Sequence, residues 1–134
     1  MQFLTSESKE YVATLSLGTS TDTYDASGKI IETKEFHALD NNEIVACFNN
    51  FIGSQEQKPP IYSAIKVNGK KLYEYARAGE QVEVPTRSVT VNHLEILQIE
   101  NNLIKFKVGC SKGTYIRSLC YDLAKALGYP GHMK

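Results

Sequence analysis

Two alternating segments joined by a short polar turn constrain the fold of this chain more than any other feature. Residues 89–99 and 103–110 are rich in apolar side chains and flank Glu100-Asn101-Asn102. Two such segments separated by three polar residues are typical of a β-hairpin. In the second segment Lys105 and Lys107 alternate with apolar residues, so we expect a buried face made of Ile104, Phe106, Val108 and Cys110.

The rest of the chain predicts a mixture of strands and helices. Tyr11 to Gly18 alternates, which indicates a half-buried strand with Tyr11 on its inward face. Asp40 and Glu43 have the spacing of a capping box, and the helix they open would end at Gly53 with an apolar face of Ile44, Phe48, Phe51 and Ile52. The other expected elements are a strand over 29–36, an extended segment over 61–67, a turn at Asn68-Gly69, a short helix over 70–78 ending at Gly79 and a last amphipathic helix from about 116 to Gly128. We therefore predict an α+β fold, with a mixed, mostly antiparallel sheet flanked by helices.

Length and composition limit the class of protein. A chain of 134 residues suits one domain, and 42% hydrophobic residues are ordinary for a folded protein. Apolar runs stay well short of the ~20 residues of a membrane span, so no membrane partner is expected. The three cysteines, Cys47, Cys110 and Cys120, are an odd number at unrelated spacings. They indicate a reducing, cytoplasmic setting and are expected to be small buried side chains.

The charge of the chain averages to zero but changes along it. Residues 1–57 carry three basic and nine acidic side chains, whereas residues 103–134 carry six basic side chains and Asp122. A cationic last third could bind phosphate groups. Solvated lysines on ordinary strands would give the same count, so this gradient alone does not decide between the two.

Three groups of residues together resemble the TruB family, the bacterial tRNA pseudouridine synthases that act on the T-arm loop. The first group consists of residues 9–11, 17–18, 21–25 and Gly28. The second consists of residues 62–66, 69–70, 72–77 and Gly79, and the third of residues 110–117. The resemblance extends from about Phe3 to His132. It implies a pseudouridine-synthase-type sheet, RNA as the partner, and an isomerase that needs no cofactor and no metal.

The family's nucleophilic aspartate lies in a Gly-x-Leu-Asp-Pro-Leu-Ala-Thr-Gly motif that this chain does not contain. Its aspartates are Asp22, Asp25, Asp40 and Asp122, and a helix cap fully explains Asp40. The resemblance therefore implies a fragment, residues 1–134, of a catalytic domain whose fold is incomplete here. It would begin just after the nucleophile motif and end before the family's C-terminal RNA-binding domain.

The resemblance assigns catalytic roles to three residues. Arg117 matches the arginine that pairs with the catalytic aspartate, although position alone favours an ordinary surface arginine. Tyr11 matches the tyrosine that stacks on the target base, although most strand tyrosines simply pack. Tyr115 either lines the same pocket or packs, and the sequence leaves both alternatives open.

Two further positions are candidate RNA contacts. Asp25 matches a residue at the edge of the family's active site, whereas its turn-rich surroundings favour backbone capping. Ser111-Lys112-Gly113-Thr114 precedes a helix but lacks the spacing of a nucleotide-binding P-loop. A single RNA phosphate near Lys112 is the more plausible ligand.

Residues 58–87, which we call the thumb segment, combine basic and aromatic side chains. By resemblance this segment is an inserted thumb that clamps the tRNA loop, and packed tyrosines on a solvated surface are the alternative. The candidate RNA-binding residues here are Lys58, Lys66, Lys70, Lys71, Arg77 and Arg87.

The resemblance implies that the full-length protein converts uridine to pseudouridine at position 55 of tRNA, and that the isolated chain, without the nucleophile motif, is inactive. The alternative is a non-catalytic RNA-binding module that has lost its nucleophile. The full-length protein is expected to be a monomer. The isolated chain is expected to self-associate, because the inward residues Ala13, Leu15, Leu17, Ile104, Phe106 and Val108 would lack some of their partners.

Overall fold

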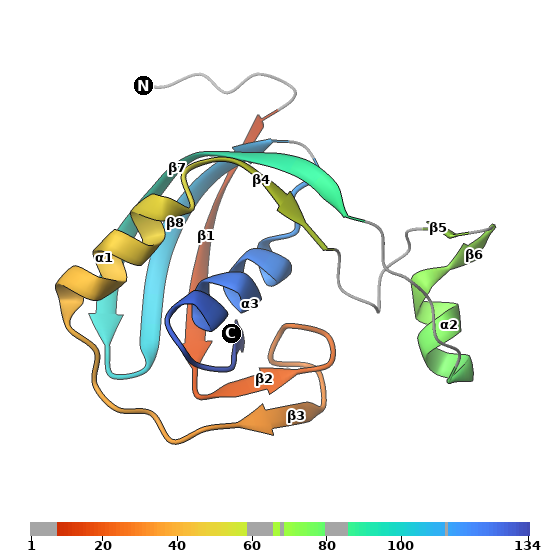
Figure 1. The fold of residues 1–134 in the computed structure, drawn as a ribbon, viewed down its shortest axis with the longest axis horizontal. Coiled ribbons are helices and arrows are strands. Elements are labelled where there is room, and N and C mark those ends of the chain that lie inside the picture. Colours follow the sequence, from red (N-terminus) through yellow and green to blue (C-terminus); the bar gives the residue numbers. More distant parts are fainter. Residues whose placement is uncertain (1–7, 59–65, 68, 80–85, 112) are drawn as a thin grey trace.

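A curled antiparallel sheet with a helix in its hollow forms the centre of the structure (Figure 1). The structure, a computed structural model, describes residues 8–58, 66–67, 69–79, 86–111 and 113–134. Within this described part, five strands pair in the order β4-β7-β8-β1-β9. Their bounds are β4 (Gly53–Gln57), β7 (Arg87–Glu100), β8 (Leu103–Ser111), β1 (Ser8–Leu17) and β9 (Gly131–Met133).

The predicted hairpin is confirmed as β7 and β8, which are longer than the pattern indicated. Asn101 turns the chain with a φ of +52°, which asparagine adopts more readily than most residues. The register of the pair shifts between Val91 and His93 and again between Ile96 and Gln98. Such bulges bend and twist a strand, which agrees with the curl of the sheet around the helix.

Helices α1 (Asn41–Asn50) and α3 (Ile116–Ala126) supply the other half of the core. The Asp40 side chain accepts a hydrogen bond from the Asn42 N–H at 2.9 Å, which confirms the predicted cap of α1. Ile44 and Phe48 are buried as predicted, but Ile52 lies beyond the helix and is exposed. The core cluster consists of Leu15, Leu17, Ile44, Phe48, Val91, Leu94, Ile104, Phe106, Val108, Cys110, Leu119, Cys120, Leu123 and Ala124.

This core contradicts the expected reason for self-association. Leu15, Leu17, Ile104, Phe106 and Val108 are all buried, and Ala13 packs against the same cluster. Because α1 and α3 cover the inward face of the sheet, these residues have their partners within the chain. The prediction that they lack partners is wrong.

Two strands of the sheet were missed by the sequence patterns. β4 has the polar sequence Gly-Ser-Gln-Glu-Gln and pairs with β7, and β9 is a three-residue strand that pairs with Leu15–Leu17. A side chain at Gly131 of β9 would run into Ala124 of α3, so only glycine fits between the helix and β1. The strand predicted over 29–36 shrinks to β3 (Ile30–Thr33), which pairs with β2 (Thr19–Thr21) and is exposed along its length.

A small unit protrudes beyond the ends of β4 and β7 (Figure 1). Its described elements are β5 (Lys66–Val67), β6 (Lys70–Lys71) and α2 (Leu72–Ala78). Gly69 has a φ of +79° between β5 and β6, and Gly79 has a φ of +72° after α2, so the expected turn and helix end are present at these glycines. Most of the extended segment predicted over 61–67 lies outside the described residues.

The cysteines are free, as predicted, with Cys110 and Cys120 buried and Cys47 half-buried. Burial raises the pKa of Cys120 to about 12, so this thiol stays protonated and packs as a small apolar group. In the part of the chain that the structure describes, no helix is long and apolar enough to cross a membrane.

Candidate active site

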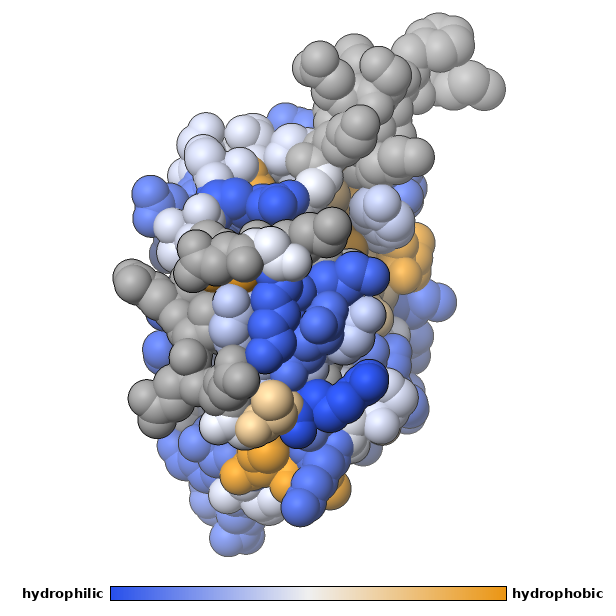
Figure 2. Space-filling view, turned by 90° about the vertical axis from the view of Figure 1, so that its right-hand side faces the viewer, coloured by the Kyte–Doolittle hydropathy of each residue, from blue (hydrophilic) through white to orange (hydrophobic). Residues whose placement is uncertain are grey.

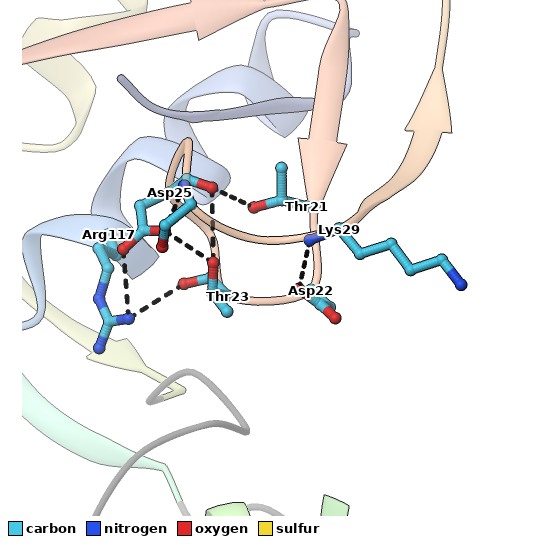
Figure 3. A network of polar contacts seen from close by, with 7 residues as sticks. Thr21, Asp22, Thr23, Asp25, Lys29 and Arg117 are labelled. Atoms are coloured by element: carbon cyan, nitrogen blue, oxygen red, sulfur yellow. Dashed lines mark hydrogen bonds and ion pairs between the residues drawn. The ribbon is translucent and has the colours of Figure 1, made fainter.

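Arg117 lies in the first turn of α3 and points at the loop that joins β2 to β3 (Figure 3). Its Nη1 atom donates a hydrogen bond to the Thr23 carbonyl oxygen at 3.3 Å and lies 3.6 Å from Oδ2 of Asp25. The two side chains of this ion pair are 27% and 22% exposed. Arg117 therefore pairs with an acid of its own chain rather than extending into solvent.

The loop is built to hold the Asp25 carboxylate. Its Oδ1 atom accepts hydrogen bonds from the Ser27 N–H at 3.0 Å, the Ser27 hydroxyl at 2.6 Å and the Thr23 hydroxyl at 2.7 Å. Oδ2 is the oxygen that faces Arg117. The capping role predicted from the turn-rich sequence is thus present, and the same carboxylate also meets the arginine (Figure 3).

The environment of Asp25 favours the charged form of its carboxyl group. Partial burial raises the pKa, but hydrogen bonds from Ser27 and Thr23 and the charge of Arg117 outweigh it, so the pKa of Asp25 lies below its ordinary value. A carboxylate in this state is a poor proton acceptor at neutral pH. Its chemistry fits the role of a partner that holds Arg117, not that of a general base.

The three residues expected to act in catalysis do not all meet. Tyr11 is on the same face of β1 as Leu15, but it lies beyond the covered core and is 42% exposed. Among the described residues no hydrogen bond or ring contact joins Tyr11 to Arg117. Tyr115 immediately precedes α3, and its ring lies 5.9 Å from the guanidinium carbon of Arg87.

A pocket of about 380 Å³ has Tyr24 and Tyr121 in its wall, and we call it the tyrosine pocket. Tyr24, with a φ of +67°, precedes Asp25, and its ring stacks on that of Tyr121 at a centroid distance of 4.5 Å. Burial raises the pKa of Asp122, and Lys125 and Lys58 only partly oppose this effect. The lining residues are Tyr24, Glu56, Lys58, Thr86, Tyr121, Asp122 and Lys125.

The sequence patterns gave no indication that Tyr24 and Tyr121 form one wall. Tyr121 follows Arg117 by one helical turn, so the two side chains lie on the same side of α3. That spacing is the signal that would have placed Tyr121 near the site. Tyr24 could be placed there only with its neighbour Asp25.

Three described basic residues of the thumb segment lie against tyrosines. Lys70 is 4.7 Å from the Tyr75 ring centroid, and Lys71 and Arg77 lie 5.5 Å and 5.4 Å from that of Tyr73. These are distances at which a cation is attracted to a ring face. Figure 2 shows the side of the molecule on which this unit lies, where hydrophilic residues predominate.

Of the remaining RNA-binding candidates, the structure describes the side chains of two, Lys58 and Arg87. Lys58 is exposed at the tyrosine pocket, and Arg87 donates a hydrogen bond to the Gly113 carbonyl oxygen at 3.4 Å. The side chain of Lys66 and the whole of Lys112 lie outside the described residues.

Gln57 is a residue that the sequence reasoning missed. It is 2% exposed, the last residue of β4, and its amide bonds to both main-chain polar groups of Tyr115. A polar residue at the end of a polar strand gives no sequence signal that it is buried. Only its pairing with Arg87 on β7, which carries it into the sheet, places it there.

Comparison with known proteins agrees with this geometry. Residues 1–116 match the model of the family described as TruB family pseudouridylate synthase (N terminal domain). The chain is 52% identical over 134 residues to tRNA pseudouridine synthase B of Oceanobacillus iheyensis, covering 98% of this chain and 44% of that protein. It is 47% identical over 139 residues to the protein of the same name from Bacillus anthracis, covering 98% of this chain and 45% of that protein.

Solved structures share the fold. A chain in the crystal structure of a Cbf5-Nop10-Gar1 complex is 28% identical and superposes with a TM-score of 0.64, covering 95% of this chain and 28% of that one. A chain of an H/ACA RNP bound to a substrate RNA containing 2′-deoxyuridine is 24% identical and superposes with a TM-score of 0.59, covering 95% and 26%. This second likeness concerns the fold alone.

The chain thus spans less than half the length of the curated relatives it matches. The match nevertheless covers nearly the whole of the chain, from the sheet to α3, the helix that carries Arg117. The chain belongs to the TruB family of pseudouridylate synthases.

Proposed function

We propose that this chain is part of a tRNA pseudouridine synthase that isomerises uridine at position 55, in the T-arm loop. The observation that carries the proposal is the Arg117 guanidinium, which lies in the first turn of α3 and pairs with the Asp25 carboxylate. It occurs in a chain that is 52% identical to a tRNA pseudouridine synthase B. A planar guanidinium can hold a carboxylate in a fixed orientation, which a carboxylate nucleophile requires. In this proposal the nucleophilic aspartate comes from a segment outside these 134 residues.

The reaction is an isomerisation in which no atom is gained or lost. The aspartate carboxylate bonds to the sugar carbon of the flipped uridine as the bond between that carbon and N1 of the uracil breaks, and the uracil turns. C5 then bonds to the same carbon as its bond to the carboxylate breaks, the proton on C5 leaves, and N1 takes up a proton. Arg117 orients the carboxylate, and the exposed ring of Tyr11 offers the extruded uracil a surface that replaces its lost stacking.

The tRNA T-arm is the proposed partner, held by the thumb segment. Basic side chains supply phosphate contacts, and tyrosines beside them supply stacking surfaces. Lys70, Lys71 and Arg77 provide this combination in the described part of the segment, and Lys58 and Arg87 lie at its two ends. The reaction needs no cofactor and no metal, and we place it in the cytoplasm.

Tritium release from a T-arm stem-loop labelled at C5 of uridine tests the proposal. The full-length gene product that contains this chain should release tritium, and the isolated chain should release none. Stoichiometric release by the isolated chain would show that its own residues supply the nucleophile. A full-length product that binds the stem-loop without releasing tritium would instead support the non-catalytic RNA-binding module.

A further inference from the structure

The two polar side-chain atoms of Gln57 both bond to one residue, Tyr115. Its Nε2 atom donates to the Tyr115 carbonyl oxygen at 3.0 Å, and its Oε1 atom accepts from the Tyr115 N–H at 2.8 Å. The side chain is 2% exposed. A buried amide is costly unless it is bonded, so this two-point contact fixes Tyr115 relative to β4.

Tyr115 is the residue from which α3 starts. It occupies the N-cap position with φ −90° and ψ 113°, and its side chain makes no capping hydrogen bond. Its carbonyl oxygen accepts the first helical bond, from the Leu119 N–H at 3.1 Å, together with the bond from Gln57. The amide of Gln57 therefore holds the start of the helix in the absence of a side-chain cap, and Arg117 follows two residues later.

Gln57 also stands where the thumb segment leaves the sheet. Its register partner is Arg87, the residue at which the chain returns to the sheet in β7. Arg87 contacts the same short stretch of chain, through the Gly113 carbonyl oxygen at 3.4 Å and the Tyr115 ring at 5.9 Å. Gln57, immediately before the thumb segment, and Arg87, its last residue, thus both contact the short stretch that precedes α3.

We propose that Gln57 is a positioning residue for the reaction, joining the base of the thumb segment to the first turn of α3 and thereby setting Arg117. This rests on the proposed function. RNA gripped by the thumb segment would then act on the arginine through Gln57 and Tyr115. We call the contact between Gln57 and Tyr115 the joint. Its loss should lower kcat and leave KM, which depends on RNA binding, nearly unchanged.

Gln57→Glu tests the proposal, because a carboxyl group has nearly the shape of the amide. As a neutral acid it can still donate to the Tyr115 carbonyl oxygen, whereas as a carboxylate it cannot. Burial raises a carboxyl pKa by several units, so the variant is expected to be mostly neutral at about pH 6 and more charged at about pH 8. In the full-length enzyme we expect kcat about tenfold below wild type at about pH 8 and within about twofold at about pH 6, with KM within about twofold throughout.

Gln55→Glu is the matched control. Gln55 lies two residues earlier on β4, and its amide donates to the Phe51 carbonyl oxygen at the end of α1 rather than to α3. This variant should show kcat within about twofold of wild type at both pH values. The proposal would be overturned if the ratio of the Gln57→Glu kcat to the wild-type kcat were the same at both pH values. A loss confined to KM would also overturn it.

Two further measurements keep the result independent of folding and of the proposed function. Gln57→Met has a similar size and no charge, so a folded variant with wild-type kcat would overturn the proposal even if Gln57→Glu unfolds at high pH.

Hydrogen exchange of the Tyr115 amide in the wild-type chain needs neither activity nor RNA. Exchange as slow as that of Leu119 supports the joint, and exchange as fast as that of exposed Gly113 overturns it. An inactive wild-type enzyme with a protected Tyr115 amide would contradict the proposed function and leave the joint in place.

Discussion

Oδ2 of Asp25, in the loop between β2 and β3, lies 3.6 Å from Nη1 of Arg117 in α3. The other oxygen of the same carboxylate is bonded to Ser27 and Thr23. The pair ties the β2–β3 loop to the helix that carries the arginine. Among the residues that the structure describes, Asp25 is the one acid paired with Arg117.

This pair predicts an acid-sensitive loop. Since the pKa of Asp25 is lower in the folded chain than its ordinary value of 3.8, its carboxylate stabilises the fold above that value and the contribution is lost as the pH falls below it. We expect Asp25→Asn to lower the free energy of unfolding by about 1.5 kcal/mol at neutral pH. The difference should shrink below about pH 4, as measured by urea unfolding at several pH values.

Asp22→Asn is the control for that experiment. Asp22 is in the same loop, and its Oδ1 atom accepts one hydrogen bond from the Lys29 N–H at 2.9 Å. An asparagine oxygen accepts the same bond, so this variant should stay within about 0.5 kcal/mol of wild type. Equal losses for the two variants would show that the charge of Asp25 is not what matters.

Asp122 should show the opposite dependence on pH. Its pKa is raised, chiefly by burial, so its ionised form opposes folding at any pH above that raised value. Asp122→Asn removes this cost and should raise Tm at pH 7. Well below the ordinary pKa of 3.8 the Asp122 carboxyl is neutral in both the folded and the unfolded chain, so the two melting curves should converge. A lower Tm for Asp122→Asn at pH 7 would show that Lys58 and Lys125 outweigh the burial.

The part of the fold that could be predicted from sequence is the part whose signals are local. The β7–β8 hairpin, the Asp40 cap and the apolar stripe of α3 depend on neighbouring residues, and all three are present. β4 and β9 depend on partners far along the chain, because Gly-Ser-Gln-Glu-Gln and Gly-His-Met become strands only beside β7 and β1.

The candidate site follows the same division. Arg117 and Asp25 could each be singled out from sequence, but nothing local indicates that they meet, since α3 must first pack into the curled sheet. Tyr11 was expected on the buried face, and it lies on the same face of β1 as Leu15, yet it is exposed. Gln57 could not be singled out, because only tertiary pairing buries it.

The core between the sheet and α1 can be tested by one substitution. Phe48 of α1 and Phe106 of β8 meet edge to face, with ring centroids 5.4 Å apart at 80°, and both are buried. Phe48→Ala should cost about 3–5 kcal/mol of unfolding free energy, because the cavity cannot collapse between helix and sheet. Val45→Ala, on the exposed side of the same helix, should cost less than about 0.5 kcal/mol. A loss below 1 kcal/mol for Phe48→Ala would show that α1 is not needed to close the core.

Binding of the T-arm stem-loop should depend on salt through the thumb segment. Each phosphate contact contributes about 0.7–0.9 to the slope of log affinity against log salt. Arg77 is exposed beside the Tyr73 ring, so Arg77→Ala should reduce the slope by about one such increment. Lys105→Ala, on the outer face of β8, should leave the slope unchanged, and equal effects of the two variants would point to nonspecific attraction.

Self-association of the isolated chain remains a prediction. Because the core residues are buried, we now expect it to occur at an unpaired edge of β1. Along β1, β9 pairs with Leu15–Leu17, and the Lys134 N–H bonds to the Thr14 carbonyl oxygen. Among the residues that the structure describes, no strand pairs with the other side of Glu10–Ala13. Tyr11 and Val12, on the two faces of this stretch, are 42% and 55% exposed. An open edge with apolar side chains invites a second copy to pair with it.

Light scattering of the isolated chain over a range of concentrations should therefore show a rise in mean mass. Val12→Lys should suppress that rise, because a lysine on an edge strand must be desolvated when a second strand pairs beside it. Val45→Lys adds the same charge at an exposed position of helix α1, which offers no strand edge, and should leave association intact. If both lysine variants dissociate the chain equally, net charge rather than the β1 edge governs association. If the wild-type chain stays monomeric at every concentration, the edge is protected by residues of the chain itself.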